Sequence, residues 1–238
     1  MTMRRFLGRI GLLSAAAGIG YAGYIAWLGI DSARPSVCRG NAVYGSLEDG
    51  RRLPYAGENY RSYSLMMFAL GRTFVHSSVR NAMRDAYARL HQTNPELRFV
   101  YAETGWPWGG RFRPHRTHAN GTSVDFHVPV RAADSQVSEL PTAPWHLYGY
   151  AVDFDRRGRS GSQTLDFEAM GAHLLALDSA ARTHGIRIRR VIFDVNLQPR
   201  LAATPSGAAA MSRMEFNKRQ AWVRHDEHYH VDFAVQCR

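Results

Sequence analysis

Residues 228–235 read HYHVDFAV, and this stretch is predicted to be a β-strand that ends the chain. Side chains alternate between the two faces of a strand, so His228 and His230 point the same way, with their backbones about 6.5–7 Å apart. One imidazole can therefore bind a metal ion while the other faces a substrate. Tyr229 points to the opposite face, where we expect it to pack. In a helix the two histidines would diverge, and this argument would fail.

A second group of polar residues lies earlier in the chain and offers further metal ligands. His115 and His118 lie in a segment dense in Gly, Pro and Trp, and Asp125 follows His118 after six residues. With His230, residues His118 and Asp125 make a set of two imidazoles and one carboxylate, which suits zinc better than calcium or magnesium. Three protein ligands leave one position for water, which is the pattern of catalytic zinc sites.

The remaining chain is predicted to form an α+β fold. Apolar residues at helical spacing predict one helix from Ser77 to before Pro95 and another from Phe167 to a stop at Gly185. Strands are predicted over residues 97–101, 123–130, 148–154, 186–195 and 228–235. Loops are predicted over residues 104–121 and 202–212, with loops and short strands over 38–72. The expected architecture is a small, mostly antiparallel sheet with flanking helices.

The N-terminal segment has the features of an export signal. Three arginines and no acid lie in the first nine residues, and residues 10–30 contain no charge. This apolar run is long enough to span a bilayer, and the arginines would hold its start in the cytoplasm. A cleaved signal peptide is the alternative. We therefore expect a signal or anchor segment with a linker over residues 1–34 and an exported domain over 35–238, which is periplasmic and anchored in the inner membrane, or released if the leader is cleaved.

The net charge of the chain limits the classes of macromolecule that it is expected to bind. The net charge of +10 favours a polyanion, which could be nucleic acid, an anionic membrane or an anionic wall polymer. No block of five or more like charges occurs in the sequence, which argues against nucleic acid as a partner.

The two cysteines lie at opposite ends of the expected domain. Cys38 follows the leader, and Cys237 is the penultimate residue. In an oxidising compartment a disulfide between them would join the two ends of the domain. Two unpaired thiols are the alternative.

These motifs, in this order, resemble the LAS metallopeptidases, the group named for lysostaphin, D-Ala-D-Ala carboxypeptidase and Sonic hedgehog. More narrowly, the chain is similar to the penicillin-insensitive murein endopeptidases over most of residues 38–238. The resemblance rests on residues 53–60 (LPYAGENY), residues 109–112 (GGRF) leading into His115-x-x-His118, and His225-x-x-His228-x-His230 followed by Cys237.

The resemblance implies the roles of the site residues. The family's zinc ligands correspond to His118, Asp125 and His230. His228 corresponds to the histidine that assists catalysis, and His225 and His115 correspond to further active-site histidines. His115 is expected to approach the metal in some states.

The chain also departs from the family pattern. Family members usually carry more cysteines, and the middle of this chain offers Asp153 and Asp155 without a spaced histidine, so we do not predict a second metal site. Asp232 stands where the family has a basic residue. It could contact a ligand or face solvent, and the sequence does not decide between these two alternatives. Arg111 and Arg116 flank the site and are candidates for binding substrate carboxylates, since arginine binds carboxylates through two hydrogen bonds.

The sequence thus predicts a zinc-dependent murein endopeptidase that hydrolyses D-alanyl–diaminopimelate cross-links in peptidoglycan. No HExxH glutamate is present, so His228, helped by His225, is the expected base. Two alternatives share this scaffold. One is a D,D-carboxypeptidase that trims terminal D-Ala, and the other is a non-catalytic wall-binding module that keeps zinc for structure.

Overall fold

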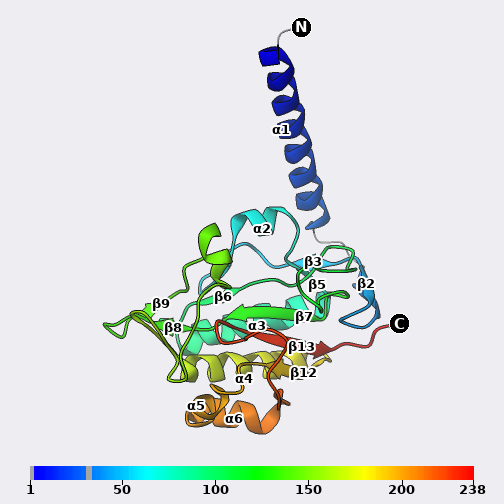
Figure 1. Cartoon of the computed structure of the whole chain (residues 1–238). Helices are drawn as coiled ribbons and strands as arrows, with labels where there is room; N and C mark the ends of the chain where they lie inside the picture. The colour runs from blue at the N-terminus through cyan, green and yellow to red at the C-terminus, as the bar shows by residue number, and fades with distance from the viewer. Residues whose placement is uncertain (1–2, 31–33) are drawn as a thin grey trace.

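A computed structural model describes residues 3–30 and 34–238, with side chains from residue 14 onward. Its centre is a five-stranded sheet (Figure 1). Only the pair β4–β6 is parallel within this sheet, and the other neighbours are antiparallel. The strands, in sheet order, are β12 (Arg187–Ile192), β13 (His228–Ala234), β7 (Ser123–His127), β6 (Phe99–Tyr101) and β4 (Tyr60–Ser62). The predicted α+β class with a mostly antiparallel sheet is confirmed.

The two predicted helices are present and pack against the sheet. They are α3 (Ser77–Thr93) and α4 (Phe167–Thr183). The side chain of Asp166 accepts a hydrogen bond from the Ala169 amide and caps the start of α4. Gly185 has φ +70° just after α4, in the left-handed region that favours glycine. The buried apolar faces of α3, α4 and the central strands form one hydrophobic core.

Strands β7 and β13 present different chemistry on their two faces. Val124 and Phe126 of β7, with Tyr229 and Val231 of β13, belong to the hydrophobic core. The residues between them are polar and point to the opposite face, because successive side chains of a strand alternate. Both faces of β7 are nevertheless buried, so its polar side chains lie in an enclosed environment.

The predicted surface loop over residues 202–212 is wrong. Two short helices occupy this region, α5 (Gln198–Ala202) and α6 (Pro205–Arg213). The hydroxyl of Thr204 caps the amide of Gly207, and Pro205 starts α6. Helix α6 packs on the side of α4 away from the sheet (Figure 1).

The predicted strand over residues 148–154 is also wrong. A 3-10 helix, η1 (Pro144–Gly149), covers its start, and the rest is irregular. Leu147, Tyr148 and Gly149 have φ angles of +46°, +58° and +105°, which no β-strand accommodates. The smaller sheet beside this region has the order β10 (Arg159–Ser160), β11 (Gln163–Leu165), β8 (Val130–Arg131) and β9 (Val137–Ser138).

Residues 38–72 contain short strands and loops, as predicted, and also one short helix, α2 (Leu65–Ala69). Strand β1 (Val37–Gly40) pairs with β2 (Gly45–Glu48), and β3 (Arg51–Arg52) pairs with β5 (Phe74–Val75). A disulfide joins Cys38 of β1 to Cys237.

The N-terminal segment is helical. Helix α1 (Met3–Leu28) projects from the domain in Figure 1. Among the residues that the structure describes, no helix is both long and apolar enough to cross a membrane. The predicted anchor therefore gains no support and stays a prediction. Residues 31–33, within the expected N-terminal segment 1–34, lie outside the described residues, and the boundary between residues 34 and 35 also stays a prediction.

Candidate metal centre

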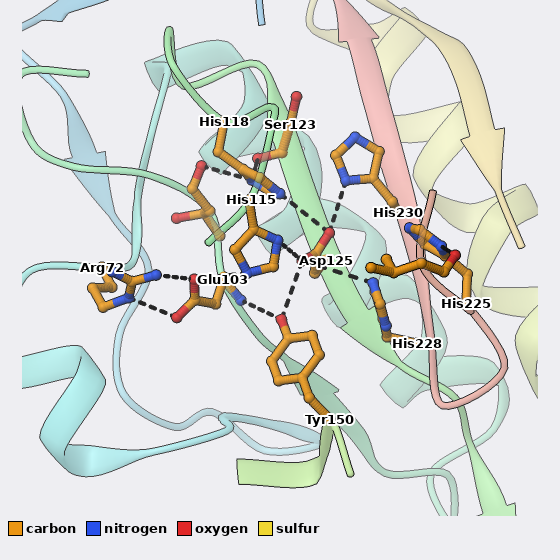
Figure 2. A network of polar contacts seen from close by, with 12 residues as sticks. Arg72, Glu103, His115, His118, Ser123, Asp125, Tyr150, His225, His228 and His230 are labelled. Atoms are coloured by element: carbon orange, nitrogen blue, oxygen red, sulfur yellow. Dashed lines mark hydrogen bonds and ion pairs between the residues drawn. The ribbon is translucent and has the colours of Figure 1, made fainter. Parts of the chain in front are cut away.

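The candidate site lies on the polar face of strands β7 and β13, beside the loop that joins β6 to β7 (Figure 2). Asp125 of β7 is directly opposite His230 of β13, and His127 is opposite His228. Side chains of opposed residues in an antiparallel pair are close neighbours. The sheet register therefore brings the carboxylate of Asp125 to the two histidines of the C-terminal strand, as their predicted orientation requires.

His118 presents one ring nitrogen to the site. Its Nδ1 lies 3.1 Å from the carbonyl oxygen of Thr104 and 3.2 Å from that of Ser123. Carbonyl oxygens only accept hydrogen bonds, so Nδ1 carries the hydrogen and Nε2 carries a lone pair. This Nε2 is buried, has no hydrogen-bond partner among the described residues, and lies 3.3 Å from Oδ1 of Asp125. A buried ring nitrogen without a partner is costly unless a cation occupies the space before it.

His230 is held between two carboxylates. Its Nδ1 lies 2.8 Å from Oδ1 of Asp125, and its Nε2 lies 2.8 Å from Oδ1 of Asp232. Burial lowers the pKa of His230, but the two carboxylates outweigh burial and raise it to about 10. The surroundings thus favour a positive charge between His230 and Asp125, which a proton or a metal ion can provide.

Asp125 is fully buried and has several polar neighbours. Burial disfavours its charged form, but the surrounding imidazoles outweigh burial and lower its pKa well below the usual range. The hydroxyl of Tyr150 donates to Oδ2 of Asp125 over 3.1 Å. Asp125 is therefore an ionised ligand candidate, as a metal site requires.

The donor set fits a transition metal. Ligand atoms of His115, His118 and Asp125 all lie within 4.8 Å of one another, and His230 adds its Nδ1 beside Asp125. Imidazole nitrogens with one carboxylate suit zinc and related ions, whereas calcium and magnesium prefer oxygen ligands throughout. The residues predicted from the sequence as ligands are thus brought together in space.

His115 is fixed by a network that the sequence did not reveal. Its Nε2 lies 3.1 Å from Oε2 of Glu103, and its Nδ1 lies 3.5 Å from Oδ2 of Asp125. Glu103 is buried, pairs with Arg72, and accepts a 2.6 Å hydrogen bond from the hydroxyl of Tyr63. Burial lowers the pKa of His115, but Glu103 and Asp125 outweigh it and raise it. Glu103 thus orients the His115 ring toward the other candidate ligands.

His228 and Glu227 form a buried pair beside the ligands. Nδ1 of His228 lies 2.7 Å from Oε1 of Glu227, and its Nε2 lies 4.0 Å from Oδ2 of Asp125. Burial lowers the pKa of His228 to about 4 and raises that of Glu227 to about 9. Burial thus favours the uncharged form of each group, and Nε2 of His228 lies where it can exchange a proton beside the candidate ligands.

His225 stands next to this pair. Its ring centroid lies 4.5 Å from that of His228, and its Nδ1 donates to the carbonyl of Val223 over 2.9 Å. Burial lowers the pKa of His225 to about 4, so it is neutral at physiological pH.

The two acids near the HxH motif have different partners. Asp226 accepts a 2.7 Å hydrogen bond from the amide of Phe154 and pairs with Arg224, so it does not orient His228. Asp232 is buried and binds His230, and it also accepts 2.6 Å hydrogen bonds from Ser123 and Arg190. Asp232 therefore contacts the candidate metal ligand His230 and does not face solvent.

A cavity of about 990 Å³ opens over this cluster. His115, Asp125, His225, His228 and His230 line it, together with Arg116 and Trp106. Arg111 is exposed and does not belong to the lining, unlike Arg116. The cavity is large enough for a peptide segment that reaches the candidate ligands.

Sequence reasoning missed Glu103 and Tyr150, and it left open whether Asp226 or Glu227 orients an imidazole, which the structure shows to be Glu227. Glu103 and Tyr150 reach the site from segments that carry no histidine motif, so no spacing pattern in the sequence identifies them. For Glu103 the sequence offers one signal, an acid between the predicted strand over residues 97–101 and the histidine-containing loop over 104–121.

Comparison with known protein families identifies the family of this chain. A model of the protein family described as penicillin-insensitive murein endopeptidase matches residues 38–238, which include every candidate site residue. No curated protein matches the chain.

Proposed function

The chain belongs to the penicillin-insensitive murein endopeptidase family, and from this premise we propose that it is a zinc-dependent endopeptidase that hydrolyses D-alanyl–diaminopimelate cross-links. Family membership gives a peptidase that acts on peptidoglycan. The metal, the bond and the residue roles are the parts that we propose.

One observation carries the proposal of a zinc site. Nε2 of His118, Oδ1 of Asp125 and Nδ1 of His230 converge, and each imidazole is fixed so that a lone pair can face the carboxylate. We assign these three residues as ligands, with His115 as a further ligand candidate. Zinc in such a site supplies Lewis acidity, which activates water and polarises a carbonyl oxygen.

We assign proton transfer to His228. Its Nε2 faces the ligands, and Glu227 holds the opposite ring nitrogen, which fixes the orientation of the ring. A neutral imidazole in this position can accept a proton from the attacking water and later donate it to the leaving amine. His225 supports His228 through ring contact. The hydroxyl of Tyr150 donates its one hydrogen to Asp125 and so helps to hold that carboxylate in place.

We place the domain in the periplasm. Its substrate lies there, and the basic, then apolar, N-terminal segment supports export. Attachment to the inner membrane through residues 10–30 is the further expectation. Nucleic acid is not an expected partner.

Purified sacculi test the function directly. Digestion with the zinc-loaded protein should convert cross-linked muropeptide dimers to monomers, and a chelator should stop the reaction. The same assay should show much slower conversion with the His228→Ala variant. Loss of terminal D-Ala with intact dimers would instead identify a carboxypeptidase. Binding to sacculi without any change in the muropeptides would identify a wall-binding module.

A further inference from the structure

The arginines that line the cavity differ in their partners. Three of them pair with carboxylates, namely Arg72, Arg190 and Arg224. The other three form no ion pair with any carboxylate that the structure describes, namely Arg113, Arg116 and Arg219. The cavity therefore offers a ligand three guanidinium groups that have no carboxylate partner among the described residues.

Arg116 is the one of these three with an aromatic support. Its guanidinium carbon lies 4.7 Å from the ring centroid of Trp222, which is a cation–π contact. Stacking on a ring occupies one face of the guanidinium and leaves its N–H edge free to bind a carboxylate through two hydrogen bonds. Trp222 is 53% exposed, so the stacked pair is open to the cavity that both residues line.

The stacked pair also connects the two loops of the catalytic centre. Arg116 directly follows His115, whose ring contacts Asp125. Trp222 lies three residues before His225, whose ring contacts His228. Both residues line the cavity that the candidate metal ligands also line, so a carboxylate bound by Arg116 would share this cavity with the scissile bond.

We propose, on the basis of the proposed function, that Arg116 held on Trp222 is a specificity residue that binds a substrate carboxylate. In the cross-link, the carbon that bears the scissile nitrogen also bears a carboxyl group of diaminopimelate. The enzyme selects cross-links in which this carboxyl group is free. Amidation of this group removes the negative charge and one acceptor, so amidated cross-links are poor substrates.

Two muropeptide dimers test the selection, one with this carboxylate free and one with it amidated. The wild-type, full-length, zinc-loaded protein should cleave the free dimer with a kcat/KM about 10- to 100-fold higher than that for the amidated dimer. Arg116→Gln should remove the preference, mainly by raising KM for the free dimer. Trp222→Leu should reduce the preference for the free dimer, because Arg116 then loses its aromatic support. Arg213→Gln, which makes the same charge change at an exposed position at the end of α6, should keep the full preference.

Binding is measured separately so that the subsite and the enzymatic activity can fail independently. Tryptophan fluorescence reports binding of both dimers to His228→Ala and to the double variant His228→Ala/Arg116→Gln. If His228→Ala prefers the free dimer and the added Arg116→Gln substitution removes this preference, the result supports the subsite. This holds even if the wild-type protein cleaves no dimer, because the lack of cleavage would reject only the proposed function. Equal binding of both dimers to His228→Ala, or a preference that survives in the double variant, overturns the subsite.

Discussion

The imidazoles of His118 and His230 in the candidate metal centre each use one ring nitrogen to hold the ring and leave the other for the site. Two backbone carbonyls take the Nδ1 hydrogen of His118, and Asp232 binds Nε2 of His230. These partners fix which nitrogen can carry a lone pair, and such contacts tune metal affinity in known metal sites. The positions of the ligands and their hydrogen-bond partners thus form one unit.

Asp232→Asn should weaken zinc binding about 10- to 100-fold, because the substitution removes the charge that orients and polarises His230. Competition with a chromogenic chelator measures the affinity. Glu96→Gln, at an exposed carboxylate, is the matched control and should bind zinc like the wild type. An unchanged affinity in Asp232→Asn would show that Asp232 only stabilises the fold.

His228→Ala should lower the rate of cross-link hydrolysis by about 10²- to 10⁴-fold, the usual contribution of a positioned acid–base group. The zinc content should stay at the wild-type level, since His228 is not one of the proposed ligands. Rates on muropeptide dimers and metal analysis of the same sample decide the matter. Zinc loss would make His228 a ligand, and full activity would exclude it from catalysis.

The sequence predicted the ligand candidates because HxH on a strand and the H-x₆-D spacing are local patterns. It could not predict Glu103, because the bond from Glu103 to His115 depends on how the loop after β6 folds back. Nor could it separate Asp226 from Glu227, because the turn before β13 decides which acid meets His228.

At the level of elements, apolar periodicity predicted the helices and strands correctly where they pack through large side chains. Helices α3 and α4 and strand β13 all bury regular apolar positions and lie where predicted. Helix α6 was missed because its Ala, Ser and Gly residues carry no apolar stripe. It packs by close backbone approach instead, since a Cβ atom at Gly171 of α4 would overlap the backbone of Gly207.

Gly171→Ala should therefore lower the free energy of unfolding by about 1–3 kcal/mol, the usual effect of overpacking, even though alanine favours a helix more than glycine does. Denaturant unfolding measures the change. Gly23→Ala in α1 is the matched control, because no atom lies within 4 Å of the added methyl group, and it should cause no loss. Equal stability of Gly171→Ala and the wild type would contradict the tight α4–α6 contact.

At the scale of the whole molecule, the two ends of the domain are joined. The Cys38–Cys237 disulfide closes a loop of 199 residues. Two backbone hydrogen bonds strengthen the same junction, from the amide of Arg238 to the carbonyl of Cys38 and from the amide of Gly40 to the carbonyl of Arg238. The candidate metal centre lies on the central sheet and does not include either cysteine.

Replacing both cysteines by serine should destabilise the domain by about 2–5 kcal/mol, because the long loop is then free in the unfolded chain. Thermal unfolding of the oxidised wild type and the double variant measures the difference. Zinc content at 25 °C should be unchanged, and a reductant should affect only the wild type. Identical unfolding temperatures would show that the disulfide contributes nothing to stability.

The central claim is that His118, Asp125 and His230 bind one metal ion. Zinc-edge anomalous scattering from crystals of the zinc-loaded protein tests it most directly. We predict a single strong peak in contact with Nε2 of His118, a carboxylate oxygen of Asp125 and Nδ1 of His230. A zinc-loaded crystal without a peak at these three atoms, or with its peak elsewhere, would contradict the claim.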